Sequence, residues 1–417
     1  MSNIRKIGEK EIERFLELSS DAYPAFMIKS DDEREKIKKT FLEANKDPRY
    51  SIYGYFRDDK MLGQMRLFDF QMNFHGQKIL AGGLGSVAVD LLHKKEKIAK
   101  EMVEFYYKYF YELGAPIAVL WPFRHDFYKQ MGCGYGTNIY EYSVKPENLR
   151  NGKSKEHIRY LTKKDLPKLN DCYNRHVDKT HGMIEESILI RELRFERQKT
   201  SKYVGYVKDG KINGYMVISF TKGDADSFIH NNIIVEDLIY ETPQALSEML
   251  TYLHIQLDQI NRVIFRTSNE YFFSQLSDPR NETMNMMPSV YHESARFGTG
   301  MMYRILNTQG IFKAMTKRNF NNQTIKIKFN VIDSFFPANE GSIILHFNQG
   351  NLSLENDGFY DVEIDIDVSE LSSLVMGSVN FRAMYDFSLI KISDESFVDT
   401  INKLFAVEHK PICTTGF

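Results

Sequence analysis

The stretch YGYFRDDKMLGQM at residues 53–65 recurs as YVGYVKDGKINGYM at residues 203–216. In both copies, alternating apolar residues flank a short charged turn, which is Asp-Asp-Lys in the first copy and Asp-Gly-Lys in the second. Alternation with a period of two on either side of such a turn predicts two antiparallel strands joined by a tight hairpin. The sequence therefore predicts the same β-hairpin twice.

Two further similarities keep the same order around this hairpin. The paired segments are 4–7 with 158–161, and 99–106 with 246–253. A single match of this length occurs by chance, but three in register predict a duplicated unit. We therefore expect two copies of one α/β domain, at residues 1–150 and 155–290, joined by the polar linker NGKSK at 151–155.

The remaining residues, 291–417, have a different pattern. Apolar and polar residues alternate in four segments, which predicts an antiparallel sheet with one buried face. These segments are 324–331, 342–347, 351–354 and 361–367. Residues 368–376 and 396–405 are predicted helices. The expected fold class is α+β, with two tandem α/β domains followed by a smaller α+β domain.

Composition excludes several classes of protein. The 417 residues carry a net charge of only −2, without the strongly basic domain of a nucleic-acid-binding protein. Cys133, Cys172 and Cys413 form neither a CxxC pair nor a Cys/His spacing, so we expect no disulfide framework and no metal. The first residues lack an apolar signal segment, and no stretch approaches about 18 apolar residues. We expect a cytoplasmic protein without membrane contact.

A basic loop follows a short predicted strand at 85–90. The loop HKKEKIAK at 93–100 leads into a helix whose apolar residues recur at helical spacing up to Leu113. The free N–H groups and the positive dipole end of a helix N-terminus bind anions, and the lysines add charge for phosphate groups. A lysine run can also be a solvated first turn, but positive charge at a helix N-terminus is unfavourable without an anion. This placement favours a phosphate-bearing ligand.

The strand, loop and helix resemble the R/Q-x-x-G-x-G/A signature of GNAT-fold acetyltransferases, which bind acetyl-CoA. Here the signature reads Lys94-x-x-Lys97-x-Ala99, and Lys97 replaces a glycine. In that fold the strand pairs with the pantetheine amides, and the strand after the helix splays away to open the acyl channel. The residues that the resemblance assigns to acetyl-CoA are Val87, Ala88, Val89, Lys94, Lys95, Glu96, Lys97, Ile98, Ala99, Lys100, Phe123 and Arg124. The second copy has IYETPQ at 239–244 in place of the lysines, so we expect one cofactor site.

Acyl transfer to an amine needs a base for the amine proton and an acid for the departing thiolate. Tyr128, in the stretch FYKQMGCGYG at 127–136, is the candidate acid because it follows the splayed strand. A packed aromatic residue is the other interpretation. Tyr135, His125 and Asp126 are the alternative acids.

The whole chain resembles the enhanced intracellular survival (Eis) acetyltransferases. The resemblance rests on the domain order, on LGAPIAVL at 113–120 and on FYKQMGCGYG at 127–136. That family has a tandem GNAT core and a sterol-carrier-protein-like C-terminal domain. The resemblance implies that Tyr128 is the general acid and that the α-carboxylate of Phe417 is the general base. A free α-carboxyl group titrates near pH ~3.5 and can accept a proton at neutral pH, whereas a disordered tail is the other interpretation.

The same resemblance implies the acceptor and the assembly. Family members acetylate aminoglycosides and some act on protein lysines, so we expect a polycationic amine, a wide acidic pocket and a homo-hexamer. Candidate acceptor residues are Asp21, Tyr23 and Trp121. Two alternatives remain open: a lipid or small-ligand binding protein with the GNAT domains as scaffold, and a peptidoglycan aminoacyl transferase. The lysine loop counts against the second, which needs no coenzyme A site.

Overall fold

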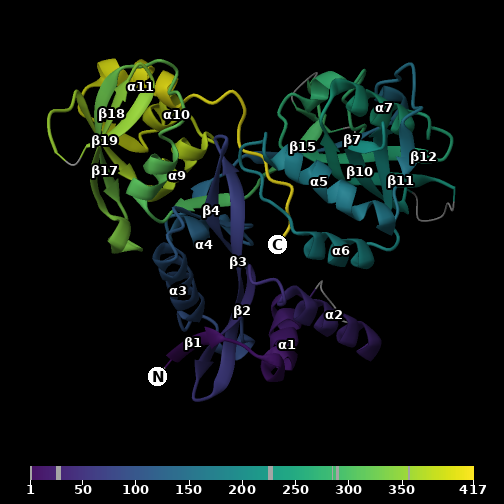
Figure 1. Ribbon diagram of the computed structural model, residues 1–417, viewed down its shortest axis with the longest axis horizontal. Helices are drawn as coiled ribbons and strands as arrows, with labels where there is room; N and C mark the ends of the chain where they lie inside the picture. The colour runs from purple at the N-terminus through teal and green to yellow at the C-terminus, as the bar shows by residue number, and fades with distance from the viewer. Residues whose placement is uncertain (1, 25–29, 224–228, 284, 288–290, 356) are drawn as a thin grey trace. The chain divides into compact units, whose positions relative to one another are not determined.

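A computed structural model describes residues 2–24, 30–223, 229–283, 285–287, 291–355 and 357–417. The chain divides into two compact units (Figure 1). The first unit consists of Met1–Gly136, His181–Ile184 and Gly300–Phe417, and the second of Thr137–Thr180 and Glu185–Thr299. Within the described residues, no helix combines the length and the apolar character needed to cross a membrane.

The first unit contains a seven-stranded sheet in the order β1-β2-β3-β4-β5-β16-β6. Its strands are β1 (Ser2–Lys6), β2 (Tyr50–Arg57), β3 (Lys60–Phe74), β4 (Gln77–Val89), β5 (Ile117–Leu120), β16 (Met302–Ile305) and β6 (Gly134–Tyr135). The predicted hairpin at 53–65 is confirmed, because β2 and β3 pair antiparallel. Asp58 and Asp59 form its turn with φ of 48° and 60°, as a tight hairpin requires.

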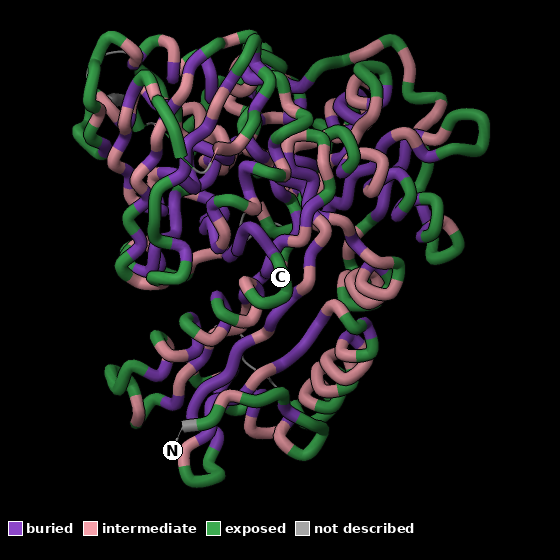
Figure 2. The backbone as a smooth tube through the Cα atoms, turned by 60° about the vertical axis from the view of Figure 1, so that its left-hand side comes forward, coloured by how far each residue is buried: buried purple, intermediate pink, exposed green. Residues whose placement is uncertain are grey.

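Helices cover both faces of this sheet. The helices are α1 (Ile12–Ala22), α2 (Asp31–Ala44), α3 (Ile98–Glu112) and α4 (His125–Lys129). Successive strand residues point to opposite faces, so Met61 packs in the core cluster of α1 and Leu62 in that of α3. Figure 2 shows buried residues running along the strands, with exposed residues mainly at turns and on outer helix faces.

The C-terminal part of the first unit is an α+β domain with a five-stranded sheet in the order β19-β18-β17-β20-β21. Its elements are α8 (Thr308–Ala314), β17 (Ile325–Ile332), β18 (Gly341–Asn348), β19 (Asn351–Glu355), β20 (Val362–Asp367), α9 (Val368–Met376), α10 (Phe381–Asp386), β21 (Ile390–Ile392) and α11 (Val398–Phe405). The predicted antiparallel order is wrong for one pair, since β20 pairs parallel with β17. Alternation indicates which face is buried but does not determine which strands are neighbours.

The second unit repeats the design with the strand order β15-β7-β12-β11-β10-β9-β8. Its elements are β7 (Asn138–Val144), β8 (Ile158–Tyr160), α5 (Leu166–Val177), α6 (Ile188–Arg197), β9 (Lys202–Lys208), β10 (Lys211–Lys222), β11 (Asn231–Tyr240), α7 (Pro243–His254), β12 (Ile260–Thr267) and β15 (Ala295–Thr299), with a small hairpin of β13 (Met286–Met287) and β14 (Tyr291–His292). Asp209 and Gly210 form the β9–β10 turn, both with positive φ, so the second predicted hairpin is confirmed.

Three strands, β7, β15 and β16, belong to a different sheet from the one that the sequence division implies. β7 precedes the linker at 151–155 but pairs with β12 and β15 of the second sheet. β16 comes after the second copy but pairs with β5 and β6 of the first sheet. The first sheet therefore takes β16 from beyond residues 1–150, and the second takes β7 and β15 from outside residues 155–290. The division at 150 and 290 stays a prediction about sequence similarity.

Candidate active site

A cavity in the first unit opens where two parallel strands separate. β4 and β5 pair from Ala81 with Ile117 to Leu84 with Leu120 and no further. β4 continues to Val89 with an irregular register, and Ser86 adopts φ of 50°. A cavity of about 520 Å³ lies at this point. Its described walls are Ser19, Tyr23, Phe41, Leu84, Gly85, Ser86, Val87, Trp121, Pro122, Phe123, Tyr128 and Phe417.

The strand segment assigned to pantetheine lies at one wall of this cavity. Ala88 and Val89 pair with β3, and the carbonyl of Val87 accepts a hydrogen bond of 2.7 Å from the Tyr23 hydroxyl. Burial raises the pKa of Tyr23, so this hydroxyl stays protonated and donates at neutral pH. Tyr23 is thus fixed at the wall, whereas Asp21 lies exposed on α1 and does not line the cavity.

The basic loop has left-handed backbone at the position where the signature has a glycine. Lys97 is the residue preceding α3, with φ of 65° and ψ of 7°, and Lys95 also has a positive φ of 68°. A left-handed conformation costs a residue with a side chain about 1–2 kcal/mol, which glycine avoids. Lys97 therefore keeps the shape of the loop at an energetic cost.

The N-terminus of α3 is open to an anion. No side chain caps it, so the first-turn N–H groups keep their hydrogen-bonding capacity. Lys94, Lys95 and Lys97 are exposed, and within the described part of the chain no carboxylate lies within ion-pair distance of them. Lys100 lies 3.7 Å from Glu104. The uncapped amides and free ammonium groups together suit the phosphates of a nucleotide-type ligand.

Other assigned residues of the loop have structural contacts. Glu96 accepts a hydrogen bond of 2.6 Å from Arg57 and lies 3.1 Å from His93, and Arg57 is the main cause of its lowered pKa. Ile98 is buried in the α3 core and Ala99 is half-buried. Glu96, Ile98 and Ala99 therefore hold the loop in place. Glu96 does not bind phosphate itself, because a carboxylate and a phosphate group repel each other.

The two residues assigned after β5 differ in their surroundings. Phe123 is 60% exposed and lines the cavity. Arg124 is exposed and donates to Asp126 at 2.8 Å, which lowers the pKa of that carboxyl to about 2. Arg124 and Asp126 are therefore paired with each other at the surface, outside the cavity wall.

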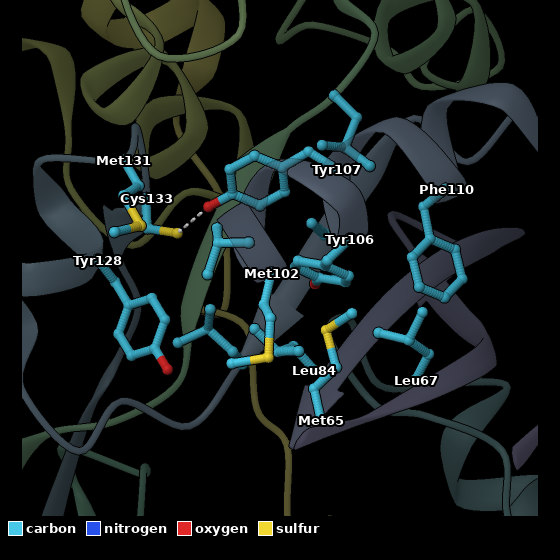
Figure 3. Packing of buried hydrophobic residues seen from close by; sticks show 14 of the residues in the cluster. Met65, Leu67, Leu84, Met102, Tyr106, Tyr107, Phe110, Tyr128, Met131 and Cys133 are labelled. Atoms are coloured by element: carbon cyan, nitrogen blue, oxygen red, sulfur yellow. Dashed lines mark hydrogen bonds between the residues drawn. The ribbon is translucent and has the colours of Figure 1, made fainter. Parts of the chain in front are cut away.

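Tyr128 combines a buried ring with a free hydroxyl. Only 3% exposed, its ring packs edge-on against Phe123 and Phe127. Figure 3 shows the hydroxyl pointing away from the sulfur of Cys133, and among the described residues it has no hydrogen-bond partner. Burial is the main cause that raises its pKa well above the usual range. Tyr128 is therefore a protonated donor that reaches the cavity.

The alternative acids do not line this cavity. Ser378 and Ser373 donate to the Tyr135 carbonyl at 2.6 Å and 3.0 Å. The His125 ring lies 6.1 Å from the ring of Tyr135. Tyr128 is the one candidate acid among the described wall residues.

The chain terminus is docked at the same cavity. The ring of Phe417 packs against Phe68 and Phe70, with ring centroids 5.4 Å and 4.8 Å away. A methyl group at Gly85 would lie 3.2 Å from the carboxyl carbon of Phe417. Trp121 donates its indole N–H to the Thr415 carbonyl at 3.0 Å. The last residues are thus held by side-chain and main-chain contacts.

A short segment from the middle of the chain supports this tail. Gly182 donates to the Asn73 carbonyl at 2.8 Å, and the N–H of Ile412 donates to the His181 carbonyl at 2.9 Å. Gly182 has φ of 90°, and any side chain there would meet the backbone of Ile412. The segment His181–Ile184 therefore links the end of the β3–β4 hairpin to the tail. Sequence reasoning missed this segment because nothing in its residue types indicates chemistry.

Among the described residues, the second unit differs from the first at the helix that corresponds to α3. Thr242 caps α7 by accepting from the N–H of Ala245 at 3.1 Å. β11 and β12 pair in parallel only as far as Val235, and just beyond lies the fully buried Arg191, 2.5 Å from Glu186. Thus α7 is capped where α3 is not, and an ion pair is buried near the point where β11 and β12 separate.

Comparison with known proteins agrees with this arrangement. Residues 3–136 and 177–305 match two family models of the acetyltransferase (GNAT) domain, and residues 311–414 match the sterol carrier protein domain. No curated protein matches the chain.

Three solved structures share the fold over 100% of both chains. A GCN5-related N-acetyltransferase from Anabaena variabilis has a TM-score of 0.82 at 16% identity. A probable N-acyltransferase from Enterococcus faecalis and Eis1 from Mycobacterium abscessus each have a TM-score of 0.78 at 17% identity.

The two GNAT domains define the chain as an acyltransferase of the GNAT class. A sterol carrier protein domain follows the two GNAT domains, and the full-length fold is similar to that of Eis1. The predicted fold class, with two GNAT domains and a sterol carrier protein domain, is therefore confirmed.

Proposed function

We propose that this protein is an acetyl-CoA-dependent N-acetyltransferase that transfers the acetyl group directly to an amine, with Tyr128 as general acid and the α-carboxylate of Phe417 as general base. The observation that carries the proposal is that Tyr128 and the terminal residue line the same cavity. One supplies a protonated donor and the other an anionic acceptor, which are the two groups that amide formation requires.

The residues of the first unit fit acetyl-CoA. The uncapped N-terminus of α3 and Lys94, Lys95 and Lys97 suit the phosphates. The β4 edge beyond Leu84, which has no strand partner on the β5 side, suits the amides of the pantetheine arm. The thioester would then lie in the cavity at the separation of the strands.

The reaction balances with these two groups. The Phe417 carboxylate takes a proton from the acceptor ammonium, and the free amine nitrogen forms a bond to the acetyl carbonyl carbon. The carbon–sulfur bond breaks, and the thiolate takes the Tyr128 proton. The nitrogen still carries one proton more than an amide, and the Tyr128 phenolate takes that proton. One proton then remains on the Phe417 carboxyl group and is released to solvent, which restores both residues.

The acceptor expected from the family resemblance is a polycationic amine such as an aminoglycoside, or a protein lysine. Support for an amine acceptor comes from the anionic terminus, which attracts an ammonium group. The expected hexamer and the cytoplasmic location stay predictions.

Release of CoA thiol with acetyl-CoA and a panel of amines tests the proposal. We expect turnover with at least one amine, and Tyr128→Phe should lower kcat by a factor of about 100 to 10,000 while leaving KM for acetyl-CoA unchanged. Tyr271→Phe, at an exposed tyrosine of the second unit, is the matched control. Absence of turnover with every amine would contradict the proposal and favour the alternative of a ligand-binding protein.

A further inference from the structure

The segment His181–Ile184 extends the first sheet by main-chain hydrogen bonds. β2 pairs with β3 only as far as Phe68, and the segment pairs with β3 beyond that point. The N–H of Gly182 donates to the Asn73 carbonyl at 2.8 Å, and the N–H of Asn73 donates to the Met183 carbonyl at 2.9 Å. The last residue of the segment forms a further antiparallel bridge with β3. The segment therefore has the main-chain partners of a short added strand.

The side chains of the segment fix it in the first unit. The main-chain N–H of His75 donates to Nδ1 of His181 at 3.2 Å, and Nε2 of His181 donates to the Met376 carbonyl at 3.0 Å. Met183 and Ile184 are fully buried. Opening the segment would expose both apolar side chains and break both hydrogen bonds of the His181 ring, and each change costs free energy. The segment is therefore a firm support for the chain that lies against it.

The tail, residues 407–417, lies against this segment at Ile412. The N–H of Ile412 donates to the His181 carbonyl at 2.9 Å. Gly182 has φ of 90°, and a methyl group there would lie 2.8 Å from Cβ of Pro411 and 2.9 Å from the carbonyl oxygen of Ile412. Both distances are shorter than van der Waals contact, so this close approach of two main chains requires glycine.

The tail is held a second time at the cavity. Trp121 donates its indole N–H to the Thr415 carbonyl, and the ring of Phe417 packs against two aromatic residues of β3. Both anchors rest on β3, since the segment pairs with the end of the same strand. One strand therefore sets the distance between Ile412 and the terminal carboxylate. Holding a reacting group in one place removes an entropic cost from the reaction.

In the sequence, the segment lies between α5 and α6, which belong to the second unit. Glu186 follows the segment closely and is anchored within the second unit. Its main chain exchanges two hydrogen bonds of 3.2 Å with the side chain of Asn174 in α5. Its carboxylate lies 2.5 Å from Arg191 and 2.7 Å from Arg194. The second unit thus supplies the chain that forms the segment and holds the residues that follow it.

We infer that the segment His181–Ile184 positions the general base. It holds the tail at Ile412, so that the α-carboxylate of Phe417 stays in the cavity where it accepts the amine proton. The residues of the segment act through the tail, since none of them is among the described wall residues. The inference rests on the proposed function for the role of the carboxylate, and it gives the second unit a part in the reaction of the first.

Gly182→Ala tests the inference directly, because its methyl group would force the tail away from the segment. Gly114→Ala is the matched control. Gly114 has φ of 79°, so alanine has the same left-handed strain there, but within the described part of the chain its methyl group meets nothing within 4 Å. Carboxypeptidase A removes phenylalanine from free chain ends, and proteolysis follows the population of the open state. Mass spectrometry should show release of Phe417 at least roughly tenfold faster from Gly182→Ala than from the parent protein and Gly114→Ala.

Two further measurements separate positioning from a general loss of structure. In the CoA-release assay with the full-length protein, kcat of Gly182→Ala should fall roughly tenfold or more, because the base is misplaced. KM for acetyl-CoA should stay unchanged, because the substitution leaves the basic loop and the N-terminus of α3 as they are. Trp121, the single tryptophan of the chain, should shift its emission to longer wavelength as its indole loses the Thr415 carbonyl.

A pair of variants in the tail tests the same contact without altering the segment. Ile412→Pro removes the N–H that donates to His181, whereas Ile412→Ala keeps this N–H and shortens the side chain. We expect faster release of Phe417 and a lower kcat in Ile412→Pro than in Ile412→Ala. Equal release and equal kcat in the two variants would count against this hydrogen bond as the anchor.

The outcomes separate this inference from the proposed function. Release of Phe417 at the parental rate from both Gly182→Ala and Ile412→Pro would overturn the inference and leave the proposed function standing. Faster release with the parental kcat would show that the segment holds the tail, but it would overturn Phe417 as the base and with it the proposed function. Faster release with a lower kcat and an unchanged KM for acetyl-CoA would support both.

Discussion

Acid sensitivity of the first unit should originate in a stacked histidine pair beneath the tail. His75 and His181 stack with ring centroids 3.8 Å apart. The N–H of His75 donates to Nδ1 of His181 at 3.2 Å, so Nε2 of His181 carries the proton and donates to the Met376 carbonyl at 3.0 Å. A second proton, on Nδ1, would point at the backbone N–H of His75, which is itself a donor. The positive charge of Arg318, 3.1 Å from His75, also disfavours a charged ring in this pair. Burial is the main cause that lowers the pKa of His181 from 6.5 to about 4.

The size of the effect follows from that shift. The folded state favours the neutral ring, and this preference adds to the free energy of unfolding above pH 6.5. The addition is lost as pH falls toward 4, where the ring is protonated in the folded state as well. At 1.36 kcal/mol per pKa unit, the full loss is about 3 kcal/mol, of which about 2 kcal/mol falls between pH 7 and pH 5.

Urea unfolding followed by Trp121 fluorescence at pH 7 and pH 5 measures this loss, because the tryptophan lies in the first unit. The free energy of unfolding should decrease by about 2 kcal/mol less between pH 7 and pH 5 in His181→Gln than in the parent protein, whatever the stability of the variant at pH 7. His409→Gln, at an exposed histidine, should leave the loss as in the parent protein. An equal loss in His181→Gln and the parent protein would refute the assignment.

Three further predictions concern the loop, the core and the base. Lys97→Gly should raise the unfolding free energy of the first unit by about 1 kcal/mol relative to Lys97→Ala, because only glycine relieves the left-handed backbone; equal urea midpoints would contradict this. Asp333→Ala should lower the free energy of unfolding by about 3–5 kcal/mol, since it leaves the buried guanidinium of Arg304 without the carboxylate 2.7 Å away. A decrease below about 1 kcal/mol in urea unfolding would count against this prediction. Gly85→Ala should lower kcat roughly tenfold with an unchanged circular dichroism spectrum, because the new methyl group displaces the Phe417 carboxyl group. Full activity would show that the methyl group does not displace that carboxyl group.

Local sequence patterns were sufficient for much of the fold. The repeated hairpins follow from alternation and from turn residues that accept positive φ, as at Asp58 and Gly210. The helix predicted at 368–376 matches α9 (Val368–Met376). The basic loop was predicted because lysines at a helix N-terminus are electrostatically unfavourable without an anion, and Phe417 was a candidate because of the family resemblance.

Other features depend on which segments meet in space. The residues of β7, β15 and β16 do not reveal which sheet each strand joins, since a strand's own sequence does not specify its neighbour. The wall of the cavity uses aromatic residues at positions that resemble core positions, so their spacing cannot separate wall from core. The acidic acceptor pocket was expected from the family resemblance alone, and Asp21 does not reach the cavity.

The most direct test of the central claim is the addition of one residue at the chain end. A glycine appended after Phe417 replaces its carboxylate by an amide and moves the charge away from Gly85. A glycine added at the N-terminus is the control. The account predicts a loss of at least about 100-fold in kcat for the extended enzyme, with KM for acetyl-CoA unchanged. An extended enzyme with the parental kcat would contradict the assignment of Phe417 as the base.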